Sequence, residues 1–165
     1  FQNAKILLLR AQEKKYHGSL VNYEISQLYM NQNKLDKAKK YLKQSIELNP
    51  LSSKAHRDLS SLLIKQKSYD DAHFHIEKSL DLDYADPHSH LNLGMIMKAN
   101  KDYVNAELYF LSALDINPKY VTCILELVDL QLLMGNQEKA KIYYQKARKL
   151  FPDLKHETLD KTLNI

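Results

Sequence analysis

The sequence predicts an all-α fold in which antiparallel helix pairs stack as an α-solenoid. Two observations carry this prediction: landmarks recur every 34 residues, and small or apolar residues keep the same register on that period. Three prolines lie on this 34-residue lattice, namely Pro50, Pro118 and Pro152. Tyr84 occupies the lattice position between the first two. A repeat of this length decides the architecture, and at least three copies are needed for stability. The chain of 165 residues holds four full copies and part of another.

Small residues form three columns on this period. The first is alanine throughout, at Ala4, Ala38, Ala72, Ala106 and Ala140. The second holds alanine or serine, at Ala11, Ser45, Ser79, Ala113 and Ala147. The third is small except at its last member, at Ser26, Ser60, Gly94 and Val128. Small side chains let two helix axes approach to the near end of a range of about 8–10 Å. A larger side chain there would overpack the contact, at a cost of about 1–3 kcal/mol.

Large apolar residues form two further columns, which fill the space between neighbouring helix pairs. One holds Leu8, Leu42, Ile76, Phe110 and Tyr144, and the other holds Ile25, Leu59, Leu93 and Leu127. This succession of small, Gly or Ala, aromatic or aliphatic, Ala and Pro positions resembles the tetratricopeptide repeat. The resemblance extends from Ala4 to Leu154 and implies a right-handed superhelix whose first helices line a concave face. The sequence departs from the pattern where an aromatic is common early in each unit, at Asn22, His56, His90 and Ile124.

We predict a single domain over residues 1–165. It comprises the second helix of a truncated unit (1–18), four full repeats (19–52, 53–86, 87–120 and 121–154) and a last segment (155–165). Two interpretations of the last segment stay open: a polar capping helix, which solenoids need, or a truncated next unit. Lys161 occupies the inward column there, which favours the cap. Because Phe1 starts in the middle of a unit, we interpret the chain as a fragment, and a leader or anchor outside it stays open.

Local signals predict where helices begin and end. The second helix of the first full unit is expected over about residues 35–48, and Gly18 is expected to give the helix before it a left-handed exit. Short polar side chains that accept hydrogen bonds from backbone N–H groups predict N-caps. They are found at Ser68, Asp86, Asp102 and Asn136.

Composition excludes several classes of function. No apolar run approaches the roughly 18–20 residues that span a membrane, and no basic-then-apolar signal segment is present. The net charge of +4 is modest and distributed, which argues against nucleic-acid binding. The eleven tyrosines could stack on RNA bases, but most fall on inward columns. The single cysteine, Cys123, rules out an internal disulfide and favours a cytoplasmic location without establishing it.

No catalytic or metal-binding set is predicted. The seven histidines include the pairs His73/His75 and His88/His90, whose i,i+2 spacing turns the rings to different sides of a helix. No Cys or His cluster has the spacing of metal ligands. Cys123 falls in a column of small residues with no positioned base, so we expect a packed side chain and not a nucleophile. We therefore predict no enzyme, no cofactor and no metal.

The outward positions of the first helices predict a binding groove. They form an apolar stripe flanked by charges of both signs, and such a surface suits an apolar-faced helix or an extended peptide. The predicted groove residues are Tyr23, Gln27, Met30, Arg57, Ser61, Ile64, Leu91, Asn92, Met95, Leu125, Asp129 and Leu132. The alternative for each apolar member is that it packs between neighbouring units. The predicted function is a non-catalytic scaffold for a protein or peptide ligand; a substrate-recruiting arm of a larger enzyme or assembly factor is the alternative.

One known mode of recognition is not expected. Some members of the resembled family grip the C-terminal carboxylate of chaperone tails with a Lys/Asn/Asn/Lys/Arg set. In one window the matching places hold Tyr23, Gln27, Asp58, His88 and Asn92. In the next window they hold Arg57, Ser61, Asn92, Thr122 and Glu126. Neither window supplies the cations, and its carboxylates would repel the ligand, so we predict no chaperone-tail binding. Self-association through the terminal repeats stays open.

Overall fold

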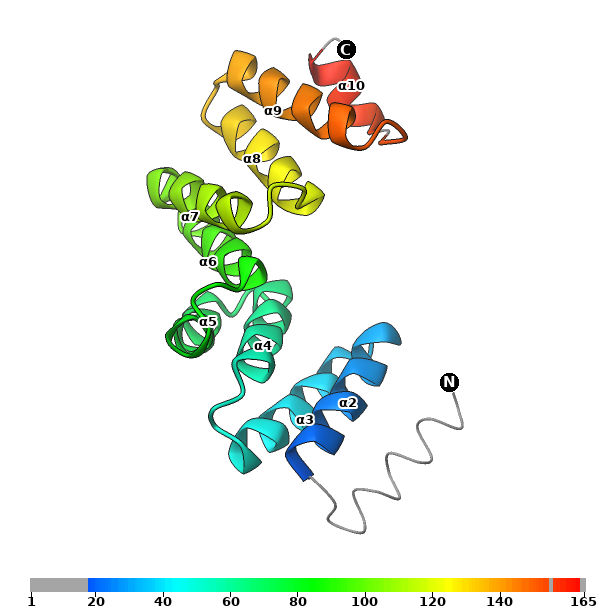
Figure 1. Cartoon of the computed structure of the whole chain (residues 1–165), viewed down its shortest axis with the longest axis vertical. Helices are drawn as coiled ribbons and strands as arrows, with labels where there is room; N and C mark the ends of the chain where they lie inside the picture. The colour runs from blue at the N-terminus through cyan, green and yellow to red at the C-terminus, as the bar shows by residue number, and fades with distance from the viewer. Residues whose placement is uncertain (1–17, 155, 164–165) are drawn as a thin grey trace. The chain divides into compact units, whose positions relative to one another are not determined.

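The computed structural model describes residues 18–154 and 156–163, without the side chains of residues 157 and 158. The predicted helix of the truncated unit, with Ala4, Leu8 and Ala11, lies outside the described residues. Throughout the described ranges every regular element is an α-helix (Figure 1). The helices are α2 (Gly18–Asn31), α3 (Leu35–Leu48), α4 (Ser53–Lys65), α5 (Tyr69–Leu82), α6 (Pro87–Ala99), α7 (Tyr103–Ile116), α8 (Val121–Leu133), α9 (Gln137–Leu150) and α10 (Glu157–Leu163).

The chain forms two compact units, each described by itself. Unit 1 ends at Tyr84 and holds α2 to α5, and unit 2 begins at Ala85 and holds α6 to α10. Consecutive helices pair as hairpins: α2 with α3 and α4 with α5 in unit 1, and α6 with α7 and α8 with α9 in unit 2. Within each unit the second helix of one hairpin also packs on the first helix of the next. The single-domain prediction for residues 1–165 stays a prediction.

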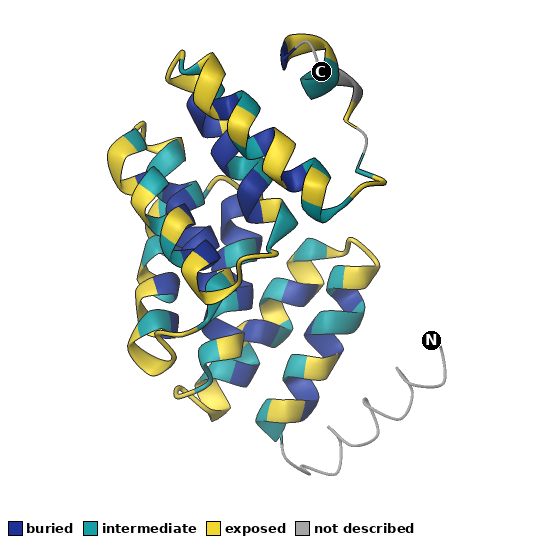
Figure 2. Cartoon of the chain, turned by 45° about the horizontal axis from the view of Figure 1, so that its top comes forward, coloured by how far each residue is buried: buried dark blue, intermediate teal, exposed yellow. Residues whose placement is uncertain are grey.

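The columns of small residues lie where paired helices meet, as predicted. The described members of the alanine column are fully buried, at Ala38, Ala72, Ala106 and Ala140. On the second helices α3, α5, α7 and α9 the buried residues gather along one side, whereas α4 and α6 are buried around most of their circumference (Figure 2). The two serines of the second column use their hydroxyls to bond the start of the partner helix. Ser45 Oγ donates to the carbonyl of Ser19 at 2.8 Å, and Ser79 Oγ donates to that of Ser53 at 3.0 Å.

Gly94 marks a close approach between α6 and α7. A Cβ atom at this position would lie 2.5 Å from the ring of Phe110, which is fully buried on α7. Only glycine therefore allows α6 and α7 to pack at their observed separation with a phenylalanine between them. The third column is small for this reason in the α6–α7 hairpin.

The hairpin turns share one backbone feature, which the residue type predicts at only two of the four positions. The residue two places before each second helix has a positive φ, in the left-handed region: Asn33 (55°), Lys67 (59°), Lys101 (63°) and Gly135 (76°). Glycine and asparagine are common in that region, whereas lysine is not. At Lys67 and Lys101 the left-handed turn therefore follows from the hairpin geometry, whereas at Asn33 and Gly135 the residue type favours it as well.

The predicted caps are confirmed in part. Asp86 Oδ1 accepts from the N–H of His88 at 3.1 Å, and Asp102 Oδ1 accepts from that of Asn105 at 3.2 Å. Ser68 and Asn136 occupy N-cap positions, but neither makes a side-chain cap bond. Ser68 Oγ donates to the carboxylate of Asp71 instead, and Asn136 Nδ2 donates to Gln131 Oε1. These donated hydrogen bonds orient the Ser68 hydroxyl and the Asn136 amide toward neighbouring side chains and not toward the backbone N–H groups of the helix start.

The prediction for Gly18 was wrong. Gly18 is the first residue of α2, and its φ is not positive. A Cβ there would lie 3.0 Å from Leu48 Cδ1, so glycine serves a close approach between the start of α2 and the end of α3.

Helix α10 covers one end of unit 2. Leu163 is buried with Val128, Ala140 and Tyr144, and Leu159 packs against the same cluster. Tyr144 Oη donates to Asp160 Oδ1 at 2.7 Å, and Lys161 is exposed. This arrangement suits a capping helix, and the choice between a cap and a further unit stays a prediction.

Candidate functional site

In unit 1 three of the predicted site residues converge on one carboxylate. Tyr23 Oη and Gln27 Nε2 from α2 both donate to Asp58 Oδ2 on α4, at 2.8 and 2.7 Å. Arg57 Nε donates to the other oxygen of Asp58 at 2.9 Å. These three residues were predicted as separate groove positions, and Asp58 was not among them. Asp58 is therefore the centre of a brace between the first helices of two consecutive hairpins.

The charge balance of this brace favours binding over catalysis. Burial, and secondly the charge of Asp58, raise the pKa of the Tyr23 phenol well above its usual value. The phenol therefore stays protonated and acts as a hydrogen-bond donor. The Arg57 guanidinium neutralises Asp58, so neither group is a free acid or base. The brace can hold a surface rigid, but it offers no nucleophile.

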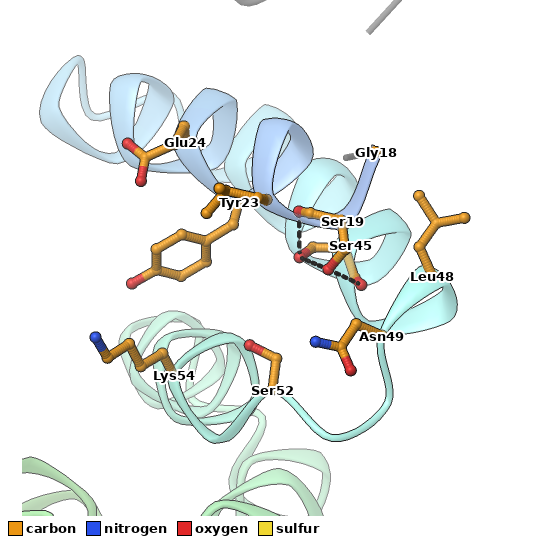
Figure 3. Close-up of a pocket in the computed structure, with 10 residues that line it drawn as sticks. Gly18, Ser19, Tyr23, Glu24, Ser45, Leu48, Asn49, Ser52 and Lys54 are labelled. Atoms are coloured by element: carbon orange, nitrogen blue, oxygen red, sulfur yellow. Dashed lines mark hydrogen bonds between the residues drawn. The ribbon is translucent and has the colours of Figure 1, made fainter. Parts of the chain in front are cut away.

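A pocket of about 590 Å³ opens at the start of α2, the end of α3 and the start of α4 (Figure 3). Glu24 and Lys54 line it from α2 and α4, with the Tyr23 ring extending between these helices. The whole lining is Gly18, Ser19, Leu20, Tyr23, Glu24, Ser45, Leu48, Asn49, Ser52 and Lys54. The lining offers both charged and apolar side chains. The residues from the end of α3 and its following loop were missed, because helical spacing was applied only to the first helices.

Three of the predicted apolar or polar residues are more buried than a contact surface requires. Ile64, Leu91 and Asn92 are exposed by 8%, 6% and 6% of their surface. Leu91 belongs to a core cluster with Ile124 and Leu127. The alternative left open by the sequence, packing inside the fold, therefore describes Leu91 better than ligand contact does.

In unit 2 the other predicted residues lie at the edge of the core. Met95 packs partly against the cluster that contains Leu91, and Leu125 and Leu132 pack partly against the cluster closed by α10. All three keep an intermediate exposure. Met30 and Ser61 have a similar exposure in unit 1. The first-helix face of unit 2, defined by Met95, Leu125, Asp129 and Leu132, thus offers apolar surface beside a charge.

A lysine braces the first helices of unit 2. Lys98 Nζ on α6 donates to Glu126 Oε2 at 2.5 Å and to Asp129 Oδ2 at 2.9 Å, both on α8. Burial alone would lower the pKa of Lys98, but the hydrogen bonds and charges of the two carboxylates together raise it. One ammonium shared by two carboxylates leaves one net negative charge. Asp129 carries it toward solvent, because its side chain is 59% exposed.

Other chemistries find no support among the residues that the structure describes. No three His, Cys, Asp or Glu side chains in those ranges are placed to hold a metal ion. Cys123 is fully buried, its Sγ donates to the carbonyl of Phe110 at 3.1 Å, and burial raises its pKa to about 12. The prediction of a packed cysteine is confirmed. None of the described helices combines the length and the apolar character that a membrane crossing needs.

Two histidines of unit 1 form a hydrogen-bonded pair. His56 Nε2 lies 3.2 Å from the carbonyl of Pro50, and His56 Nδ1 lies 3.0 Å from His75 Nδ1. A carbonyl only accepts, so His56 Nε2 carries the proton and His56 Nδ1 accepts one from His75 Nδ1. In this arrangement the His56 ring is neutral, and the hydrogen bond itself does not fix the proton on His75 Nε2. Burial, and next the neighbouring His56, lower the pKa of His75 to about 4, and burial also lowers that of His56.

We expect unit 1 to lose stability as the pH falls from about 6.5 to about 4. The unfolded chain binds a proton at His75 near pH 6.5 and the folded chain only near pH 4, so protons favour the unfolded state in this window. Allowing for partial exposure, the loss should be about 1–2 kcal/mol. Urea unfolding at a series of pH values measures it. The His75→Phe variant should lose this part of the pH dependence; an unchanged dependence would contradict the pairing.

Two family models, both described as tetratricopeptide repeat, match the sequence. One matches residues 20–50 and 87–120, and the other matches residues 123–154. The chain belongs to the tetratricopeptide repeat family. The matched ranges leave out the α4–α5 hairpin, although its alanine column and its turn keep the tetratricopeptide register.

Solved structures show the same tetratricopeptide fold. PilW, described as a widely conserved type IV pilus biogenesis factor, superimposes with a TM-score of 0.88 at 19% identity, over 99% of this chain and 78% of its own. MamA residues 41 to the end, from Desulfovibrio magneticus RS-1, superimposes with a TM-score of 0.80 at 16% identity. The match covers 94% of this chain and 88% of that one. A thermophilic TPR protein of Thermus thermophilus superimposes with a TM-score of 0.79 at 17% identity. The match covers 98% of this chain and 87% of that one. No curated protein matches the sequence. These likenesses establish the all-α tetratricopeptide solenoid fold. The two family matches support, at the level of the family, a protein-interaction scaffold.

Proposed function

We propose that this tetratricopeptide chain is a non-catalytic scaffold that captures a helical or extended segment of a partner protein on its first helices. The observation that carries the proposal is the first-helix face of unit 2. There, partly exposed apolar side chains adjoin a carboxylate that faces solvent. Peptide-recognition surfaces combine an apolar groove with a few polar groups that set orientation.

The charge of this face favours a particular segment. Glu126 and Asp129 exceed the charge of Lys98 by one unit, so a partner with a lysine or arginine beside apolar residues is complementary. Met95 suits such a surface, because its flexible thioether adapts to varied partners. By the same charge, the proposal expects no binding of a carboxylate-terminated chaperone tail.

The test is a tandem-affinity pull-down with a matched pair of variants. Met95→Glu with Leu125→Glu places charges on the first-helix face of unit 2 and should abolish capture of the partner. Leu108→Glu with Leu111→Glu places the same charges on exposed positions of α7 and should leave capture intact. Thermal unfolding of both variants checks that the fold persists. Full retention of the partner by the first variant would move the site elsewhere.

A single exposed change then tests the charge preference. A synthetic peptide that covers the captured segment of the partner should bind the wild-type chain in calorimetry. Asp129→Lys should weaken that binding by about tenfold, because it replaces an attractive charge by a repulsive one. An unchanged dissociation constant would exclude a basic segment at this position.

A further inference from the structure

The outward faces of two second helices carry opposite charges around an exposed apolar residue. On α5 this face presents four carboxylates and one lysine, namely Asp70, Asp71, Glu77, Asp81 and Lys78. Phe74 lies among them with 56% of its surface exposed. The ion pairs within this face are long: His73 Nδ1 lies 3.6 Å from Glu77 Oε2, and Lys78 Nζ lies 3.5 Å from Asp81 Oδ2. The α5 face therefore keeps an excess of three negative charges.

The equivalent face of α9 is basic. It presents three exposed lysines and one glutamate, namely Lys139, Lys146, Lys149 and Glu138. Ile142, 63% exposed, occupies the place that Phe74 has on α5, two repeats earlier. None of the three lysines forms an ion pair with a described residue. The α9 residue that pairs with Asp160 is Arg148, which lies on the flank toward α10. The α9 face therefore keeps an excess of two positive charges.

The remaining second helices do not match this pair. The outward face of α3 mixes Lys37, Lys40 and Lys43 with Asp36 and Glu47, so its charges nearly cancel. The outward face of α7 is apolar, with Val104, Leu108 and Leu111 exposed. Only α5 and α9 combine a clear excess of charge with an exposed apolar centre among the described second helices.

We propose that the α9 face of one copy of this chain docks on the α5 face of a second copy. Opposite potentials bring the two faces together and fix their orientation, and Phe74 and Ile142 supply the apolar centre of the contact. Exposed ion pairs are worth at most about 1 kcal/mol each. The association is therefore weak and sensitive to salt.

The contact is heterologous, because it joins two different patches. The copy that docks through its α9 face keeps a free α5 face, and the copy that receives it keeps a free α9 face, so assembly continues head to tail unless the rotation closes a ring. The first-helix faces take no part in it. The inference therefore goes beyond the proposed function, and a failure of one leaves the other in place.

The experiment measures the weight-average mass of the whole chain by light scattering over a wide range of concentration. At low salt the mass should rise with concentration, and at ~1 M salt, where the Debye length is about 3 Å, it should fall toward that of the monomer. A mass that stays monomeric at low salt up to high protein concentration would overturn the proposal.

Charge reversal on either face identifies the contact. Lys146→Glu with Lys149→Glu, and separately Glu77→Lys with Asp81→Lys, should each raise the dissociation constant by about tenfold or more. A mixture of the two variants should associate again, because the unchanged α5 face of the first meets the unchanged α9 face of the second, and the two reversed faces also attract each other. Lys37→Glu with Lys40→Glu on α3 is the matched control and should change nothing. Association that survives the single reversals, or a mixture that fails to recover, would assign self-association to another surface.

Discussion

Replacing Ala106 with leucine is expected to destabilise unit 2 by about 3 kcal/mol, at the upper end of the range for overpacked cores. Ala106 has no exposed surface and belongs to the cluster that includes Phe110, Ala113 and Leu127. Three additional carbon atoms at the contact between α6 and α7 have no space, so the two helices must move apart. Chemical denaturation followed by circular dichroism measures the loss.

The matched control is Ala99→Leu at the end of α6. Ala99 is exposed, so the same enlargement there should change the free energy of unfolding by no more than about 0.5 kcal/mol. Equal effects at Ala99 and Ala106 would mean that the alanine column does not mark the helix contact.

Replacing Phe110 with alanine is expected to cost about 3–5 kcal/mol. The ring is completely buried and fills the space beside Gly94, so its removal combines lost burial with a cavity. The size of this effect depends on whether α6 can relax into the space. Denaturant unfolding of the variant measures it, and a loss below about 1 kcal/mol would contradict the packing described for Phe110.

A double-mutant cycle with Gly94→Ala tests that packing directly. In the wild-type chain the new methyl group would overlap the Phe110 ring, so the substitution should destabilise. In the Phe110→Ala chain the overlap is gone, and alanine should stabilise the helix by up to about 1 kcal/mol relative to glycine. The sign of the Gly94→Ala effect should therefore reverse. The same sign in both backgrounds would show that another neighbour limits the size of residue 94.

The fold was predictable because its cause is repeated in the sequence. Small side chains recur at fixed positions of each helix pair, so the sequence alone predicts that Ala38, Ala72 and Ala140 are buried. The identity of Gly94 was predictable in kind only, since the period requires a small residue there but does not reveal the phenylalanine ring opposite. The second helix of the first hairpin falls at Leu35–Leu48, where the sequence placed it.

The candidate site was less predictable, because helical spacing gives the direction of a side chain and not its reach. Tyr23, Gln27 and Arg57 are long enough to turn back onto Asp58, so their polar atoms are occupied inside the face. Leu91 lies on the flank of the stripe, where a small rotation about the helix axis decides between core and surface. The pairing of His56 with His75 joins residues 19 apart on different helices, a contact that no local pattern indicates.

The positive φ angles in the hairpin turns have a consequence for the evolution of such chains. A lysine in the left-handed region carries a backbone strain of about 1–2 kcal/mol that glycine escapes. In a solenoid the stability is close to a sum of terms from single repeats and their neighbours. A substitution of Lys67 or Lys101 by glycine would therefore change the free energy of local opening of one hairpin alone. Amide hydrogen exchange in that hairpin would measure the change. Substitutions at these turn positions can change which hairpin opens most readily, while the surfaces that contact a partner stay the same.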